Sequence, residues 1–452
     1  MQDTGPAGEP VNKNANRLKS LTHPCFNGCG GKNTRIHLPV APSCNIQCNY
    51  CLRKYECVNE SRPGVTAKVL TPEEALERFL EARKRLGKID VAGIAGPGDA
   101  LAEFDRVRRT FTLIRKADRG VTFCLSTNGL LLFRYAEAIA ALGVSHVTVT
   151  VNAASPQEGR RIYRYVQYEG KNYSGAEGAG ILLEKQYEGI SLLRNLGIVV
   201  KVNIVMLKDI NDAIIPGIVA KVKEAGADIT NIMQLIPVKG TIFEHIPLVS
   251  NAEITELRKK CEGILPQMYH CRQCRSDAAG TLDGDISHLF SGGECGTIES
   301  AAFQDKRESS GNSGKTLLFA VASKTGMIVD EHFGHAGAFH IYRYENGKVE
   351  FIEKREVSQY CFGPEHCGRE QELQAQTSAW EERRGSPPEG TMDSIIKTIE
   401  GCAGVIVMRI GDLPRLKLAE KGIAVFMTYN YVSDAVREAA QKKEMSNVNY
   451  SG

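Results

Sequence analysis

Residues 44–51 read CNIQCNYC, in which three cysteines are separated by three and then by two residues. The segment follows RIHLPVA (35–41), a predicted short strand, so the cysteines are expected on a loop. Three thiolates can hold three irons of a [4Fe–4S] cluster and leave one iron open, whereas a closed structural site has four protein ligands. The open iron can chelate the amino and carboxylate groups of S-adenosylmethionine (SAM). The spacing therefore predicts a radical SAM enzyme, with a zinc site or a chance cluster of cysteines as the alternative.

The chain downstream of this SAM loop (residues 44–51) alternates predicted strands and helices. The helix TPEEALERFLEARKRLG begins with Thr71 as its N-cap and Pro72 at its first position. Buried strands are predicted at IDVAGIAG, VTFCLSTNG, HVTVTVNA, IVVKVNIVM and ITNIMQLIP. Such alternation is typical of parallel strands with right-handed crossovers. About six units over residues 34–260 are fewer than a complete barrel needs, so we expect an α/β fold with an open, partial (β/α)6 barrel.

Composition excludes several classes of protein. The net charge of +3 in 452 residues gives no reason to expect nucleic acid or an anionic membrane as a partner. The polar N-terminus lacks an apolar signal segment, and no run of apolar residues is long enough to span a membrane, so a cytoplasmic protein is expected. In a reducing compartment, fourteen cysteines in clusters indicate metal binding more than disulfides, although free cysteines are also common in cores.

Polar and glycine residues at the predicted strand ends are candidates for binding SAM, because barrel sites lie at the carboxyl ends of the strands. Tyr50 precedes the last cysteine of the SAM loop and is a candidate to pack against the adenine. The other candidates are Gly96, Gly98, Asp99, Ser126, Asn128 and Asn152. Their glycines suit close approach of backbone to a ligand, but a plain turn and ordinary helix caps are the alternatives.

The remaining cysteines indicate further metal sites. Cys25 and Cys29 precede the barrel, and Cys124 lies in a predicted strand, with His37 in another. A second Fe–S site is one interpretation, while a lone histidine on a strand is more often part of the core. Cys261, Cys271 and Cys274 follow the last barrel helix and suggest another incompletely ligated cluster, or else a zinc knuckle with His270.

A second domain is predicted at the C-terminal end. Residues 299–315 are polar and rich in serine and glycine, which is typical of a linker. Residues 316–445 repeat strand and helix signals, including a hairpin with an Asn-Gly turn, and indicate a small α/β domain. The stretch 369–390 reads as an inserted loop. The ends, 1–22 and 446–452, are expected to be tails, the first of them disordered.

These motifs resemble the NifB family of radical SAM maturases, which build the core of the nitrogenase cofactor. The resemblance covers the chain from residue 23 and includes a C-terminal domain similar to the NifX type, which has an RNase H-like fold. The segments that carry it are His23–Asn27, the SAM loop, Glu60–Gly64, AGPGD (95–99), His270–Arg275 and Asp330–His335.

The resemblance implies three clusters. One, on Cys44, Cys48 and Cys51, binds SAM. A second ligand group would be Cys25, His37 and Cys124, with Cys29 competing for the place of Cys25. A third ligand group would be Cys261, Cys271 and Cys274. Two [4Fe–4S] clusters would fuse around a carbide from a SAM methyl group, with an extra sulfur, into an eight-iron product for the FeMo cofactor.

The resemblance also implies roles for individual residues and partners. Cys57 would hold a migrating cluster, Glu60 would accept protons, and Arg62 would hold Glu60 in place. Cys295 has no assigned role. His332 and His335, with Cys361, His366 and Cys367, could receive the product in the C-terminal domain, or the two histidines of the glycine turn could only cap it. Cluster donors and downstream cofactor carriers are the expected partners.

Two other functions compete with this reading. One is a radical SAM enzyme that modifies a peptide or small molecule and uses auxiliary clusters for electron transfer. The other is a non-catalytic Fe–S carrier. The His-Pro-Cys segment and the C-terminal domain argue against the first, and the complete SAM triad argues against the second.

Overall fold

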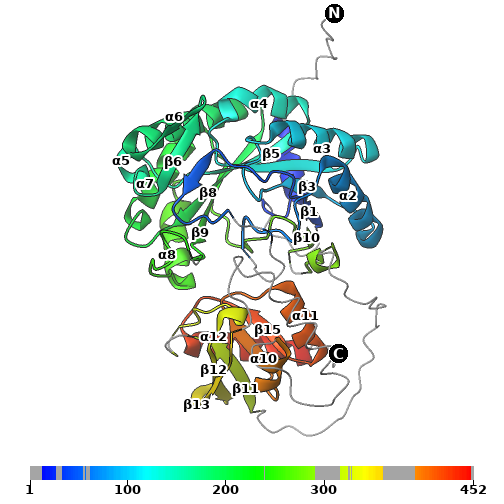
Figure 1. Ribbon diagram of the computed structural model, residues 1–452, viewed down its shortest axis with the longest axis vertical. Helices are drawn as coiled ribbons and strands as arrows, with labels where there is room; N and C mark the ends of the chain where they lie inside the picture. The colour runs from blue at the N-terminus through cyan, green and yellow to red at the C-terminus, as the bar shows by residue number, and fades with distance from the viewer. Residues whose placement is uncertain are drawn as a thin grey trace, which may run out of the picture. The chain divides into compact units, whose positions relative to one another are not determined.

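The computed structural model describes residues 13–26, 33–53, 56, 62–238, 240–282, 284–290, 316–323, 326, 328–359 and 392–448 (Figure 1). These residues form two compact units, one ending at Ser287 and the other beginning at His288. Within these ranges, no helix has the length and apolar character needed to cross a membrane.

The first unit is built on a curled sheet of seven strands, in the order β10-β1-β3-β4-β5-β8-β9 (Figure 1). From β1 to β9 each neighbouring pair is parallel, and β10 pairs with β1 in the antiparallel direction. The strands are β1 Arg35–His37, β3 Val91–Ile94, β4 Thr122–Thr127, β5 Val144–Thr150, β8 Val199–Met206, β9 Ile229–Gln234 and β10 Ala279–Gly280. The six parallel strands follow chain order, which confirms the partial (β/α)6 barrel.

Helices connect these strands along the outer side of the sheet (Figure 1). They are α2 Pro72–Leu86, α3 Phe104–Ala117, α4 Leu132–Ala141, α5 Pro156–Gly159, α6 Gly175–Asn195, α7 Ile215–Ala225 and α8 Asn251–Glu262. Thr71 caps α2 as expected, since its side chain accepts from the Glu74 N–H and the Glu74 side chain accepts from the Thr71 N–H.

A small second sheet changes the prediction for the SAM loop. Strand β2 (Ile46–Cys48) pairs antiparallel with β6 (Tyr163–Tyr168), which forms a hairpin with β7 (Lys171–Tyr173). The expectation of a plain loop is therefore wrong for these three residues. The physical reason is burial, because Ile46 and its cross-strand partner Val166 are both buried apolar residues.

The expected disorder of residues 1–22 is wrong for the part that the structure describes. Helix α1 (Lys13–Lys19) and the 3-10 turn η1 (Ser20–Thr22) are anchored on the barrel. The Asn16 side chain donates to the Gly197 carbonyl at 3.0 Å, and Ser20 Oγ lies 2.9 Å from the His146 ring. The polar composition that suggested a tail supplies these long-range hydrogen bonds.

The second unit is a five-stranded sheet in the order β13-β12-β11-β14-β15. Its strands are β11 Leu317–Ala322, β12 Ala338–Glu345, β13 Lys348–Glu356, β14 Gly404–Val407 and β15 Ala424–Met427. Its helices are α10 Met392–Thr398, α11 Asp412–Glu420 and α12 Val432–Val448. The predicted Asn-Gly hairpin is confirmed, because Asn346 and Gly347 both have positive φ at the β12–β13 turn. The predicted linker (299–315) and inserted loop (369–390) lie outside the described residues.

Candidate active site

The SAM loop is held by hydrogen bonds to its own backbone. Cys48 ends β2 opposite Tyr163 of β6. The Gln47 side chain donates to the carbonyls of Cys48 (3.0 Å) and Cys51 (2.8 Å). Arg53 donates to the carbonyls of Cys44 and Ile46. These bonds fix the path of the chain, so that all three thiols of the loop come from one short, ordered segment.

The electrostatics of the three thiols indicate that they lie near one another. Burial raises the pKa of Cys48 well above the ordinary value, and the nearby Cys51 and Cys44 raise it further. Burial, followed by the Asp99 carboxylate, raises the pKa of Cys44 to about 12. Thiols that would repel as free thiolates suit a shared cationic metal centre, because metal binding requires and stabilises the deprotonated form. The residues present therefore fit a cluster with three cysteine ligands.

The glycine-proline-glycine segment packs against the chain that leads into Cys44. The Gly98 N–H donates to the Ala41 carbonyl, and the Asp99 N–H donates to the Ser43 carbonyl, both at 2.7 Å. A Cβ on Gly98 would lie 2.1 Å from the Ser43 carbonyl oxygen. Gly96 has a φ of +113°, which also favours glycine. The glycines thus permit close approach of backbone to backbone, where the sequence had suggested approach to a ligand.

Asp99 is saturated by protein donors. Its carboxylate accepts from Thr127 Oγ1 (2.9 Å), from the Asn128 N–H (2.5 Å) and from two backbone N–H groups of the helix turn at 101–102. The carboxylate is buried, and burial raises its pKa while these hydrogen bonds oppose the rise. This arrangement favours a positioning role for Asp99 over direct contact with SAM.

Two asparagines connect the strand ends to the SAM loop. The Asn128 side chain donates to Asn45 Oδ1 at 2.6 Å and to Cys44 Sγ at 3.6 Å. The Asn152 side chain donates to the Tyr50 hydroxyl at 2.8 Å. Asn128 and Asn152 therefore contact the SAM loop, and their binding of SAM, with that of Tyr50, stays a prediction. Ser126 lies two residues before Asn128, within β4, and pairs with Thr148 of β5.

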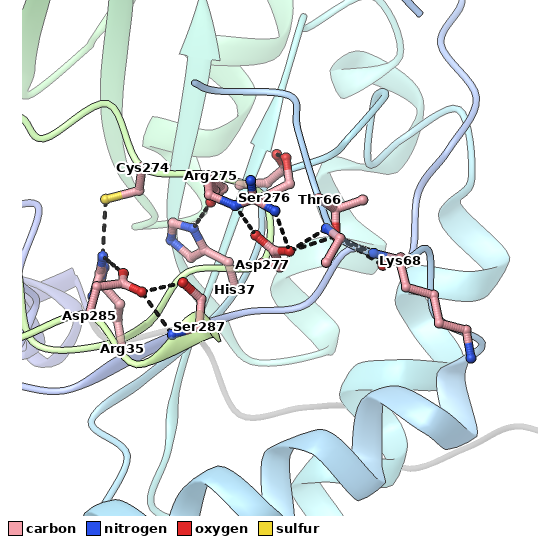
Figure 2. Close-up of polar contacts among 12 residues, drawn as sticks. Arg35, His37, Thr66, Lys68, Cys274, Arg275, Ser276, Asp277, Asp285 and Ser287 are labelled. Carbon is pink, nitrogen blue, oxygen red and sulfur yellow. Dashed lines mark hydrogen bonds and ion pairs between the residues drawn. The ribbon is translucent and has the colours of Figure 1, made fainter. Parts of the chain in front are cut away.

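His37 and Cys124 of the second ligand group meet on the inner face of the sheet. A Cβ built on Gly93 of β3 would lie 2.8 Å from Cys124 Sγ and 3.3 Å from His37 Cδ2, so both side chains cover that glycine. The His37 Nδ1–H donates to the Arg275 carbonyl at 3.1 Å (Figure 2). Burial, then Arg35, lowers the pKa of His37 to about 4. A neutral ring with its proton on Nδ1 leaves the Nε2 lone pair for a metal.

Cys25 belongs to a segment that is tied to the barrel through histidines. The His270 Nε2–H donates to the Pro24 carbonyl at 2.9 Å, and the Cys25 N–H donates to His23 Nδ1 at 3.2 Å. After burial, the charge of Cys25 raises the pKa of Cys124, and it contributes to that of Cys274. Cys25 therefore lies among the other ligands, while its competitor Cys29 lies outside the described residues.

The third ligand group is supported by groups that the sequence did not reveal. Arg35 of β1 donates to Cys274 Sγ at 3.2 Å and pairs with Asp285 at 2.8 Å (Figure 2). Asn231 of β9 donates to Cys271 Sγ at 3.2 Å. Cys261 lies within α8 and is buried, so the expectation that it follows the last helix is wrong. The spacing of Arg35 and His37, two residues apart on one strand, was the available signal for Arg35, because alternate residues share a face.

A charged network ties the loop after residue 62 to the cysteine-rich segment. Asp277 accepts from Arg275 Nε (2.9 Å), Thr66 Oγ1 (3.1 Å) and the Ala67 N–H (2.5 Å) (Figure 2). Arg62 is buried close to the SAM loop: burial raises the pKa of Cys51, and the Arg62 guanidinium acts against that rise. Cys57, Glu60 and Cys295 lie outside the described residues.

Within the described ranges, no three His, Cys, Asp or Glu side chains lie close enough together to hold a single metal ion. In the second unit, His332 Nδ1 accepts from the Gly334 N–H at 3.1 Å and caps the turn η4 (Phe333–His335). The ring of His335 lies 4.7 Å from that of His332. Capping, one of the two expected roles, is thus present. Cys361, His366 and Cys367 fall in the part that the structure does not describe.

Comparison with known proteins gives matches along most of the chain. The radical SAM superfamily matches residues 38–222, and the dinitrogenase iron-molybdenum cofactor family matches residues 315–442. The FeMo cofactor biosynthesis protein NifB of Herbaspirillum seropedicae is 37% identical over 90% of this chain and 79% of its own length. NifB of Klebsiella pneumoniae is 36% identical over 90% and 86%. NifB of Chlorobaculum tepidum is 35% identical over 93% and 92%.

Proposed function

Because this chain belongs to the NifB family of FeMo cofactor biosynthesis proteins, we propose that it fuses two [4Fe–4S] substrate clusters into the eight-iron cofactor precursor. It is a radical SAM enzyme, and its family implies one SAM-binding [4Fe–4S] cluster and SAM as cofactors. In the proposed reaction a SAM methyl group becomes a central carbide and an extra sulfur is added. The product is a precursor for FeMo cofactor assembly.

The observation that carries this proposal is the convergence of further ligands on the barrel sheet, whose strand ends also contact the SAM loop through Asn128 and Asn152. His37 and Cys124 cover the same glycine of β3, and the charge of Cys25 acts on both Cys124 and Cys274. An enzyme that only modified a peptide would have no need to gather two incomplete ligand sets in one interior. This convergence supports two substrate clusters held near each other.

The residues of the SAM loop would hold the resident cluster through Cys44, Cys48 and Cys51. When bound, that cluster supplies the electron that cleaves a C–S bond of SAM. Asn128 and Asn152 orient the loop through Asn45 and Tyr50. Asp99 holds the turn that carries Asn128. The side chains around the loop therefore serve to position its three cysteines, through a series of hydrogen bonds.

The second ligand group suits a substrate that must leave. Histidine binds iron less tightly than thiolate does, and the low pKa of His37 keeps its ring neutral and available. We propose that Cys57 holds a cluster during transfer, that Glu60 accepts protons from the methyl group, and that Arg62 keeps Glu60 in place. The burial of Arg62 near Cys51 supports the last role.

The C-terminal unit is proposed to hold the product and pass it to a downstream cofactor carrier. Its match to the dinitrogenase iron-molybdenum cofactor family supports this role. Deletion of the chain after about residue 305 tests it: the truncated enzyme should release product sooner than the full chain. Equal retention by both proteins would remove the proposed role. Iron–sulfur donor proteins are proposed as the other partners.

SAM product analysis tests the proposed reaction. Anaerobically reconstituted protein with dithionite should give both S-adenosylhomocysteine, from methyl transfer, and 5′-deoxyadenosine, from hydrogen abstraction. Deoxyadenosine alone would indicate a radical SAM enzyme of another kind. Absence of both products would favour a non-catalytic carrier.

A further inference from the structure

Lys201 is a buried cation without a carboxylate partner. Lys201 is 6% exposed and is the third residue of strand β8. The contacts of its ammonium group are Met268 Sδ at 4.0 Å and the ring of Phe26 at 5.2 Å from the ring centre. Among the described residues, no Asp or Glu forms an ion pair with it. An isolated ammonium in such surroundings is costly, so the fold retains a charge that its own side chains do not neutralise.

Strand register places Lys201 on the same face of the sheet as Cys124, two strands away. Cys124 of β4 pairs with His146 of β5, and two residues further along the strands Thr148 pairs with Lys201. Because alternate residues share a face, Lys201 lies one row beyond Cys124 on the same face of the sheet. Its other contact, Phe26, directly follows Cys25.

The groups on which the charge of Lys201 acts are histidines and a thiol, and the nearby Asp285 carboxylate, which acts on His37, is already paired with Arg35. Its charge acts on His23, His37, His146 and His270, in each case disfavouring their protonation. It acts in the opposite sense on Cys124, where it favours the thiolate. Among the described residues, Lys201 is therefore left without an anionic partner of its own until a metal–sulfide core binds to this ligand group.

We propose that Lys201 is a positioning residue that supplies the counter-charge for the anionic iron–sulfur substrate on Cys25, His37 and Cys124. The inference rests on the proposed function, which places a substrate cluster there. Thiolates and bridging sulfides concentrate negative charge at the surface of such a cluster, and reduction adds more. A buried ammonium beside them attracts the cluster and stabilises its reduced form, whereas the empty site carries the energetic cost of the unpaired charge.

The test uses the full chain with five ligands replaced, so that bound iron reports the second ligand group alone. The replaced residues are Cys44, Cys48, Cys51, Cys271 and Cys274, each changed to alanine. After anaerobic reconstitution with iron and sulfide this parent should hold about four irons per chain, one cluster's worth. Adding Lys201→Met, which keeps the side-chain length but not the charge, should speed iron loss to a chelator roughly tenfold or more.

A second readout separates this role from a structural one. Without iron, Lys201→Met should raise the melting temperature, because it removes an unpaired buried charge. The matched control is Lys208→Met, since Lys208 follows the same strand but pairs with Glu253 at the surface, and both readouts should stay unchanged. A lower melting temperature for Lys201→Met, or equal iron retention, would overturn the inference alone. A parent that binds no iron would overturn the proposed ligand set, and the inference with it.

Discussion

The SAM loop and the second ligand group both present candidate metal ligands, but they are assembled at different levels of structure. Cys44, Cys48 and Cys51 lie within eight residues and are fixed by neighbours such as Gln47 and Arg53. Cys25, His37 and Cys124 come from an N-terminal segment and two strands, and His37 and Cys124 meet over Gly93 because β1, β3 and β4 are in register. A local site depends on a few side chains, whereas a site assembled by the sheet depends on the fold around it.

The largest expected effect is the loss of SAM cleavage, which should follow from a change in the SAM loop but not from a change in the second ligand group. Cys48→Ala should abolish SAM cleavage, with at least a hundredfold loss of both SAM products, because the resident cluster loses one of its three ligands. Cys124→Ala should retain cleavage to deoxyadenosine while losing the eight-iron product. Both are measured by chromatography of SAM products and by iron analysis of the product fraction.

Cys402→Ala is the matched control for these two variants, because Cys402 is buried in the core of the C-terminal unit and belongs to neither ligand group. It should leave both readouts intact. If Cys48→Ala kept its SAM products, the SAM loop would have been wrongly identified. If Cys124→Ala lost SAM cleavage as well, the two regions would not be separable.

Replacing a closely packed glycine by alanine beside each of the two regions tests how each depends on packing. In Gly98→Ala the new methyl would meet the Ser43 backbone at 2.1 Å, which cannot give way without moving the chain into Cys44. We expect a loss of about 3 kcal/mol in the free energy of unfolding and poor loading of the SAM cluster. In Gly93→Ala the methyl would meet the Cys124 thiol at 2.8 Å and turn it away.

Gly93→Ala should therefore lose iron from the second ligand group and keep SAM cleavage. Urea unfolding and iron content per chain check both variants. Gly217→Ala is the control, because a Cβ there meets nothing within 4 Å. Equal effects of Gly93→Ala and Gly98→Ala on SAM cleavage would contradict the distinction between the two regions.

The same contrast explains what could be predicted from the sequence. The strand-helix alternation and the Thr71-Pro72 signal are local patterns, and they predicted the barrel and the α2 cap that the structure confirms. The three-cysteine site, predicted from equally local spacing, stays a prediction. The β2–β6 pairing, the anchoring of α1 and the contact of Arg35 with Cys274 join residues far apart in the chain. No periodicity records such contacts. The saturation of Asp99 was also hidden, because two of its donors, Thr127 and Asn128, come from the next strand end.

A smaller effect is expected from replacing Arg35, which connects strand β1 to the cysteine-rich segment through Cys274. Arg35→Met removes the ion pair with Asp285 and the hydrogen bond to Cys274, in a place where the arginine is 3% exposed. Leaving Asp285 unpaired should lower the free energy of unfolding by about 2 to 3 kcal/mol. It should also weaken iron retention by the third ligand group, measured in a variant without the SAM-loop cysteines.

Arg85→Met is the control for Arg35→Met. It breaks an exposed pair with Glu81 on α2, in which both side chains are about half exposed, and it should cost little. A similar cost for both arginine variants would show that the contact of Arg35 with Cys274 and Asp285 is not a supporting element of the cysteine-rich segment.

The smallest effect concerns the anchoring of the segment that carries Cys25. His146 contacts Ser20 and packs against Phe26, and burial, then Lys19, lowers its pKa to about 3. Between that value and the ordinary 6.5 the unfolded chain binds a proton that the folded chain does not, so stability falls as the pH falls below 6.5. From pH 7.5 to 5.5 the contribution of this one histidine is a loss of about 1 kcal/mol.

Urea unfolding of the iron-free protein at these two pH values measures the effect. His146→Gln, which keeps a hydrogen-bonding side chain, should reduce the pH dependence by that amount. His245→Gln should not reduce it, since the His245 ring is 90% exposed. An unchanged dependence in His146→Gln would mean that the N-terminal segment does not rely on a neutral His146. The second ligand group would then depend less on residues far away in the chain, such as His146, than the comparison with the SAM loop implies.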